Sequence, residues 1–206
     1  MRGGRFITFE GIDGSGKSTQ ARLLSAYLKS KQTNVVLTRE PGGSPGAEEI
    51  RRLLVEGAPD RWSGETEALL FTAARRDHLE KTVLPALANG ATVISDRFAD
   101  STRVYQGAAR GELRAVVDAL HDAVIQHEPD LTFVIDMEPG EALRRGLARQ
   151  SGEDRFEEMG EGFQQRLRQG FLALVADHPK RCRLIDGRRD PNEIAAEIAE
   201  IADQSA

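Results

Sequence analysis

The sequence predicts an α/β fold with a mainly parallel sheet, in a single domain that spans residues 1–206. Short apolar runs rich in β-branched residues alternate with longer helical patterns, which is typical of βα units. Several of these runs are apolar at successive positions, as in strands that helices cover on both faces. A chain of 206 residues suits one domain and is short for two. We therefore expect a central sheet between two layers of helices.

Each expected element follows from its own stretch of sequence. The expected strands are, in chain order, RFITF (5–9), NVVLT (34–38), ATVIS (91–95), LTFVID (131–136) and CRLID (182–186). The expected helices occupy about 17–31, 45–56, 65–88, 111–127, 139–149, 160–177 and 191–203. Two polar, glycine-rich segments, EPGGSPG (40–46) and RQSGEDRFEEMGEG (149–162), are expected as loops, where function tends to lie. The second is rich enough in glycine and charge to form a small mobile lid.

The composition argues against several classes of protein. Lys and Arg total 28 against 33 acidic residues, so the chain lacks the overall basic bias of a dedicated nucleic-acid binder. The single cysteine, Cys182, cannot form an internal disulfide, which favours a reducing compartment. No apolar run is long enough for a signal peptide or a membrane span. We expect a soluble, cytoplasmic protein with no nucleic-acid or membrane partner.

A phosphate-binding motif lies between the first expected strand and the first expected helix. Gly11, Gly16, Lys17 and Ser18 match G-x-x-x-x-G-K-[ST]. Glycines let successive N–H groups point at phosphate oxygens, and the helix directs its positive end to the same place. Lys17 should contact the β- and γ-phosphates and Ser18 should bind Mg²⁺. The predicted ATP-binding residues are Gly11, Ile12, Asp13, Gly14, Ser15, Gly16, Lys17, Ser18 and Thr19.

This motif is shared by switches, motors and small-molecule kinases. A GTPase would need an N-K-x-D motif, which the sequence lacks, and a motor would usually bring further domains. A compact kinase that transfers the γ-phosphoryl group to a small acceptor remains. Such a kinase needs a second pocket for the acceptor.

Two stretches before the third strand could form part of a second pocket. TREPGG (38–43) places Arg39 and Glu40 at the carboxyl end of the second strand, where ligands collect in parallel sheets. A solvated turn with an incidental ion pair is the alternative. Phe71 and Arg75 lie four residues apart on one helical face, as a stacking ring beside a forked donor would. Phe71 could equally be a core residue.

Charged residues after the third strand could bind metal and phosphate. Asp96 can hold Mg²⁺, and Arg97 can bridge the donor and acceptor phosphates. A salt bridge at the strand end is the alternative, and Asp136 is a second candidate for the metal. Arg149 and Arg155 lie on the expected lid. A lid arginine that closes over the phosphates would exclude water and stabilise the transferring charge, although a charged lid can also be merely solvated.

Taken together, these motifs resemble the bacterial thymidylate kinase family. The resemblance rests on FEGIDGSGKST (9–19), TREPGG, LLFTAARRDH (69–78), DRFADSTRVYQG (96–107) and DRFE (154–157), in this order. It implies a three-layer P-loop kinase fold with a five-stranded parallel sheet and a small lid at about 149–162. It also implies a homodimer that transfers the γ-phosphoryl group of ATP, with Mg²⁺, to dTMP for dTTP synthesis.

The resemblance also implies a role for individual residues in dTMP binding. Asp13 would face the sugar 3′-hydroxyl, and Arg39 and Arg97 would hold the phosphate. Glu40 would help to order Arg39. At the base and sugar, the implied contacts are Phe71 stacked on thymine, Arg75 at O4, Ser101 and Thr102 near N3, Tyr105 at the 2′ side and Gln106 on the same wall.

The resemblance implies direct in-line transfer by Lys17, Arg97 and a lid arginine. Some family members use a P-loop arginine, but this chain has Ser15 there, so the arginine would be Arg149 or Arg155. Because a phosphate monoester is already ionised, catalysis reduces to positioning and charge neutralisation. Two other hypotheses remain at this point: a kinase for another nucleoside monophosphate, and a slowly hydrolysing switch whose ATP turnover ignores dTMP.

Overall fold

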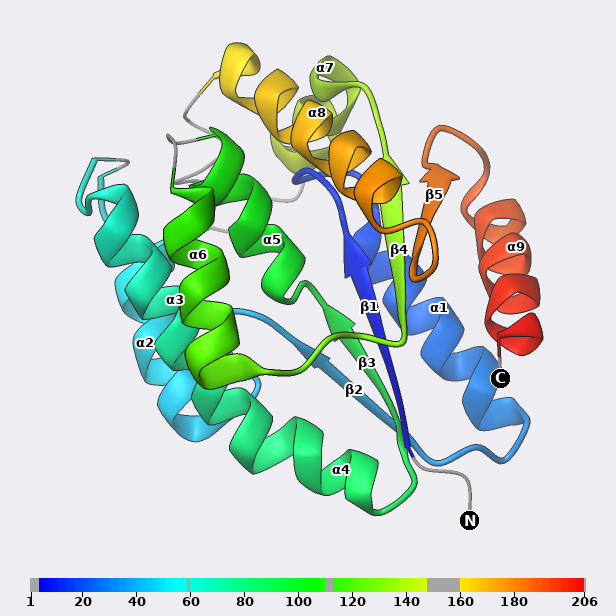
Figure 1. The fold of residues 1–206 in the computed structure, drawn as a ribbon. Helices are drawn as coiled ribbons and strands as arrows, with labels where there is room; N and C mark the ends of the chain where they lie inside the picture. The colour runs from blue at the N-terminus through cyan, green and yellow to red at the C-terminus, as the bar shows by residue number, and fades with distance from the viewer. Residues whose placement is uncertain (1–3, 59, 110–112, 148–159, 206) are drawn as a thin grey trace.

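The structure is a computed structural model that describes residues 4–58, 60–109, 113–147 and 160–205 (Figure 1). Its centre is one parallel sheet with the strand order β2-β3-β1-β4-β5. The strands are β1 (Arg5–Glu10), β2 (Val35–Arg39), β3 (Thr92–Asp96), β4 (Leu131–Asp136) and β5 (Cys182–Asp186). All five expected strands are confirmed, each within one residue of its predicted bounds.

Helices cover both faces of this sheet, as the sequence predicts (Figure 1). They are α1 (Lys17–Ser30), α2 (Pro45–Val55), α3 (Gly64–His78), α4 (Leu84–Ala88), α5 (Ala99–Val104), α6 (Arg114–Leu120), α7 (Pro139–Leu147), α8 (Glu161–Asp177) and α9 (Pro191–Gln204). Three π-helical turns, η1 (Leu79–Val83), η2 (Tyr105–Ala109) and η3 (His121–Ile125), continue α3, α5 and α6. The expected helix at 65–88 is therefore α3, η1 and α4 in succession.

Side chains of β1 alternate between the two helical layers because successive residues of a strand point to opposite faces. Ile7 and Phe9 join a core that contains Leu24 of α1 and Ile198 of α9. Phe6 joins the opposite core, with residues of η1, α5 and η3. A third cluster packs α8 and η2 against the β4 side of the sheet. The sheet is thus the middle of three layers.

Two expectations about the elements need correction or stay open. Residues 99–109 form α5 and η2, although the sequence patterns predict no helix there. This helix has no side-chain cap of its own, and a distant carboxylate binds its first turn, so no local start signal exists. The expected lid at 149–162 lies outside the described residues up to position 159, and α8 begins at Glu161. None of the described helices is both long and apolar enough to span a bilayer.

Candidate active site

Residues 11–19, predicted to bind ATP, form the loop after β1 and the first turn of α1. Gly11, Gly14 and Gly16 have φ angles of 133°, 80° and 104°, a region that favours glycine. A Cβ on Gly14 would lie 1.9 Å from the Ala142 carbonyl oxygen, so α7 packs directly on this loop. Since the N-terminus of α1 opens into the loop, the arrangement favours a bound anion.

Lys17 extends its side chain over the loop. Its Nζ donates to the Ile12 carbonyl oxygen at 2.7 Å and lies 4.0 Å from Asp13 Oδ1. Burial first, and then the nearby Arg97 charge, lower the pKa of Lys17 to about 8. The buried ammonium is directed at the loop rather than at solvent, which suits a phosphate ligand.

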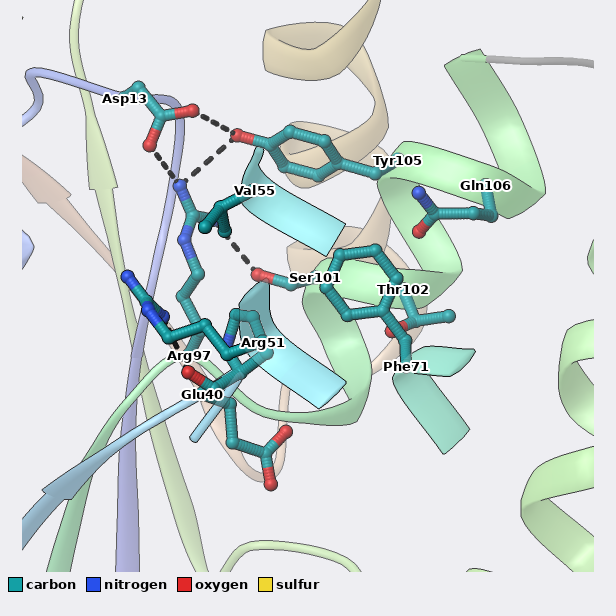
Figure 2. Close-up of a pocket in the computed structure, with 11 residues that line it drawn as sticks. Asp13, Glu40, Arg51, Val55, Phe71, Arg97, Ser101, Thr102, Tyr105 and Gln106 are labelled. Atoms are coloured by element: carbon teal, nitrogen blue, oxygen red, sulfur yellow. Dashed lines mark hydrogen bonds and ion pairs between the residues drawn. The ribbon is translucent and has the colours of Figure 1, made fainter. Parts of the chain in front are cut away.

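Arg97, which follows β3, connects the P-loop with α5 (Figure 2). Its backbone is left-handed, with a φ of 73°, and its N–H donates to the Phe9 carbonyl oxygen at 2.9 Å. Nη2 donates to Asp13 and, at 3.1 Å, to the Tyr105 hydroxyl. Tyr105 in turn donates to Asp13 Oδ2 at 2.9 Å, and Arg97 Nη1 donates to Ser101 Oγ at 2.9 Å. The P-loop and the segment after β3 therefore meet at one ion pair.

The charges of this ion pair stabilise each other. Burial alone would raise the pKa of Asp13, but Arg97 and then Lys17 outweigh burial and lower the pKa to about 2. Burial would likewise favour a neutral Arg97, but the Asp13 carboxylate raises the pKa of Arg97 well above its ordinary value. Both groups are charged at neutral pH.

A cavity opens beside this ion pair, and Figure 2 shows its side chains converging from the P-loop, from the segments after β2 and β3 and from neighbouring helices. Asp13, Arg97 and Tyr105 form one end. The Phe71 ring lies at the other end, beside Thr102 and Gln106. Eight of the predicted dTMP-binding residues line this cavity, and the complete lining is Asp13, Glu40, Pro41, Arg51, Val55, Phe71, Arg97, Ser101, Thr102, Tyr105 and Gln106.

Arg75 is almost completely buried and bonds to two residues that line this cavity, Glu40 and Thr102. Nε donates to Glu40 Oε2 at 2.8 Å, and Nη2 donates to Thr102 Oγ1 at 3.0 Å and to the Phe98 carbonyl oxygen at 3.1 Å. The other Glu40 oxygen bonds to His78 Nδ1 at 2.9 Å. Arg75 thus ties α3 to the loop after β2 and to α5, where its partner Thr102 lines the cavity.

Arg39 does not line this cavity. Its Nη2 lies 3.1 Å from Glu48 Oε1 on α2, while the Glu40 oxygens are engaged by Arg75 and His78. Arg39 instead lines a second cavity of about 470 Å³, together with Ser18 and Asp96. The two residues predicted to bind metal therefore share one cavity.

The second cavity has a group that fits a cation. Asp96 Oδ1 is buried and has no hydrogen-bond partner among the described residues. The rival candidate, Asp136, accepts two bonds from Arg168, at 2.7 Å and 2.9 Å. The part of the chain that the structure describes holds no group of three or more His, Cys, Asp or Glu residues placed to bind a metal ion. A divalent ion would therefore depend on Asp96, on Ser18 and on oxygens of a bound phosphate.

Sequence reasoning missed several residues of this site. Glu10 is buried and accepts hydrogen bonds from Phe98 and Ser101. Its only signal is an acid at the end of an otherwise apolar strand. Arg51 and Val55 line the first cavity from α2, where their spacing of four places them on one face. The predicted lid arginines, Arg149 and Arg155, lie outside the described residues.

The fold and the site define a class of protein. A glycine-rich loop with a lysine joins a parallel strand to a helix, and the arginine that follows the adjacent strand connects this loop to the first cavity. This combination is that of a P-loop phosphotransferase, which binds a nucleoside triphosphate and an acceptor.

Comparisons with known proteins identify the family. The model of the thymidylate kinase family matches residues 9–198. The chain is 69% identical to the thymidylate kinase of Dinoroseobacter shibae over 95% of this chain and 94% of that protein. It is 63% identical to the thymidylate kinase of Ruegeria pomeroyi over 96% of this chain and 94% of that protein. The crystal structure of thymidylate kinase from Ehrlichia chaffeensis matches with a TM-score of 0.81 and 37% identity, covering 98% of this chain and 100% of that chain.

The chain belongs to the thymidylate kinase family, as its motifs indicate. Its reaction is the ATP-dependent phosphorylation of dTMP to dTDP. The predicted fold class and activity are confirmed.

Proposed function

We propose that dTMP binds in the first cavity with its phosphate at Arg97 and its sugar 3′-hydroxyl at Asp13, the ion-pair partner of Arg97. The observation that carries this proposal is the direct bond between these two residues, one from the P-loop and one from the segment after β3. ATP held by the P-loop and an acceptor held in the cavity would meet there. Direct in-line transfer needs this proximity and no covalent enzyme intermediate.

The opposite end of the cavity suits a pyrimidine base. Phe71 would stack on thymine, and Thr102 would lie at its edge near N3, with Ser101 adjacent. Arg75 uses Nε and Nη2 to hold Glu40 and Thr102, so Nη1 is the nitrogen that would reach O4. The Phe71 ring lies at the cavity and not in a core cluster, which supports stacking.

The sugar would lie between these two ends. Asp13 would accept a hydrogen bond from the 3′-hydroxyl, and Tyr105 would occupy the 2′ side and disfavour a ribose. Gln106 forms the adjacent wall, where its Nε2 donates to Glu67 at 3.1 Å.

Arginine and Mg²⁺ would neutralise the phosphates. Arg39, which is in register with Asp96 across the β2–β3 pair, would exchange Glu48 for the dTMP phosphate. Ser18 and Asp96 would hold Mg²⁺, and this assignment is supported by Asp96 Oδ1, which has no hydrogen-bond partner in the described part of the chain. When bound, the ion supplies charge neutralisation between the β- and γ-phosphates. One of Arg149 and Arg155 would complete the positive charge from the lid.

An ADP-release assay tests these roles. The wild type should be nearly silent with ATP alone and fastest with dTMP, compared with dUMP, dCMP and ribothymidine monophosphate. Lys17→Met should abolish transfer and keep the fold, because within the described residues the Lys17 side chain contacts only the loop itself, at the Ile12 carbonyl oxygen and at Asp13. Near-normal turnover in Lys17→Met would contradict the site, and ATP consumption indifferent to the acceptor would favour a switch.

The homodimer and the cytoplasmic location also remain proposals, as does the lack of a nucleic-acid partner. Leu69 of α3, Val116 of α6 and Val124 of η3 are large apolar side chains with exposed fractions of 55%, 42% and 40%. α3 and α6 lie beside each other on one side of the molecule (Figure 1), and α3 contacts both α6 and η3. Sedimentation equilibrium should give twice the 22.6 kDa chain mass, and Leu69→Lys should shift it to the monomer.

A further inference from the structure

Glu10 is a buried carboxylate for which the proposed reaction has no use. It is the last residue of β1, directly before the P-loop, and its exposed fraction is 0%. Its Oε1 accepts from the backbone N–H groups of Phe98 at 2.8 Å and of Ser101 at 3.3 Å. Its Oε2 accepts from the Ser101 hydroxyl at 2.6 Å. These three hydrogen bonds compensate for the burial of the carboxylate and hold it in one position.

These bonds make Glu10 the cap of α5. The N–H groups of a first helical turn lack partners within the helix, and a negative charge there is stabilising. Phe98, at the N-cap position of α5, provides no side-chain hydrogen bond. Glu10 supplies the missing acceptor from a strand that lies 88 residues earlier in the chain. The start of α5 is therefore fixed to the end of β1.

The same carboxylate fixes the direction of a hydrogen-bond chain. An ionised carboxylate can only accept, so the Ser101 hydroxyl must donate to it. The lone pairs of Ser101 Oγ then face Arg97, whose Nη1 donates to Oγ at 2.9 Å. Arg97 Nη2 reaches Asp13 of the P-loop. By accepting the hydroxyl hydrogen of Ser101, Glu10 thus leaves the oxygen lone pairs of Ser101 for Arg97.

The neighbouring charges are arranged around this carboxylate. Asp100, the next acid along α5, is also buried and would repel Glu10. Two arginines neutralise Asp100: Arg103 donates to it at 2.8 Å and Arg181 at 2.9 Å. Because these arginines neutralise Asp100, the Glu10 carboxylate can accept the hydrogen bond from Ser101, which in turn contacts Arg97.

We propose that Glu10 is a positioning residue for phosphoryl transfer, which holds the Arg97 guanidinium, through Ser101, at the point where the two substrates meet. The inference rests on the proposed role of Arg97. Glu10 itself touches no substrate. Its removal should therefore impair the use of dTMP without changing the P-loop contacts to ATP.

Glu10→Gln is the sharpest test, because it keeps the shape of the side chain. The amide oxygen can still accept from the two N–H groups, but the NH₂ group must donate to Ser101 Oγ and turns the hydroxyl hydrogen toward Arg97. Loss of the hydrogen bond between the charged Arg97 and the Ser101 hydroxyl predicts a fall of about 10- to 100-fold in kcat/KM for dTMP. KM for ATP should stay within about twofold of the wild-type value, because the substitution does not change the P-loop residues that bind ATP. Assays belong at about pH 8, above the Glu10 pKa of about 7.

A matched control separates positioning from stability. Thr8 lies on the same strand and the same face, and its buried Oγ1 bonds to Thr132 Oγ1 at 2.8 Å. Thr8→Val removes a buried hydrogen bond but has no connection to Arg97. It should lower the melting temperature and leave kcat/KM for dTMP unchanged. A Glu10→Gln variant that is folded, loses stability and keeps its dTMP kinetics would overturn the inference.

Ser101→Ala carries the test if Glu10→Gln does not fold. It removes the intermediate hydroxyl and should lower dTMP affinity, measured by isothermal titration calorimetry, by a similar factor. Where both variants fold, the double variant should cost no more than the larger single effect, because the two side chains act in one chain. Additive losses, or wild-type affinity in Ser101→Ala, would refute the chain. Arg97→Ala distinguishes failure of this inference from failure of the proposed function. Wild-type kinetics in Arg97→Ala would refute the proposed function itself. A loss of dTMP kinetics in Arg97→Ala alone, with Glu10→Gln and Ser101→Ala unaffected, would refute only the role of Glu10.

Discussion

The buried ion pair of Arg75 and Glu40 gives the most quantitative prediction. The side chains are 4% and 3% exposed, and the Nε–Oε2 distance is 2.8 Å. Arg75→Met keeps the length of the side chain and leaves the Glu40 carboxylate buried with His78 as its remaining described partner. Breaking a buried pair from one side costs about 3–5 kcal/mol, because an uncompensated charge is left behind. For a chain of this size the melting temperature should fall by roughly 6–20 °C.

The double variant Glu40→Gln/Arg75→Met tests whether this cost is electrostatic. Removing both charges should recover much of the stability, since no buried carboxylate is left unpaired. Urea denaturation would measure the free energy of unfolding of the wild type, both single variants and the double variant. KM for dTMP should remain raised in the double variant, because the O4 contact is absent. Equal stability of Arg75→Met and wild type, or a double variant less stable than either single one, would refute the reasoning.

Three further predictions concern the P-loop side of the site. Gly14→Ala should weaken ATP binding strongly, because its Cβ would lie 1.9 Å from the Ala142 carbonyl oxygen; a normal KM for ATP would contradict this. Tyr105→Phe removes a hydroxyl that bonds to Asp13 and should raise KM for dTMP about 10-fold, with ATP titration as the control. Burial raises the pKa of Glu10 from 4.5 to about 7, so the folded state binds more protons than the unfolded state in this range, and the wild type should lose about 3 kcal/mol of stability relative to Glu10→Gln as the pH rises from 4.5 to 7. Parallel stability curves of these two proteins would exclude that shift.

The strands and the P-loop could be predicted because their signals are local. Each strand is a short β-rich apolar run, and the motif from Gly11 to Ser18 lies between a strand and a helix, as it must. The side chains that line the first cavity were also found in large part, since Phe71 and Tyr105 stand in distinctive motifs. A contiguous stretch of sequence was therefore sufficient to predict an element or motif whose formation does not depend on contacts with distant residues.

The remaining features depend on contacts between distant residues. α5 is six residues long, and its cap comes from Glu10, so neither length nor a local start signal marks it. The partner of Glu40 is Arg75, 35 residues away, although the nearer Arg39 is the partner suggested by sequence. Arg51 and Val55 belong to an ordinary amphipathic helix, and only the packing of α2 over the cavity gives them a place in it. Such pairings follow from the strand order, which the sequence patterns do not contain.

The strand order also explains why one loop can serve two substrates. β1 and β3 are adjacent and parallel, and Phe9 is in register with Asp96, so the P-loop and Arg97 leave the sheet at the same level. Ligands collect at the carboxyl ends of parallel strands, especially where neighbouring connections diverge. Asp13 can therefore belong to the triphosphate loop and still pair with Arg97 of the acceptor cavity. If phosphoryl transfer depends on this adjacency, any variant that loosens the β1–α5 junction should impair dTMP use before it impairs ATP binding.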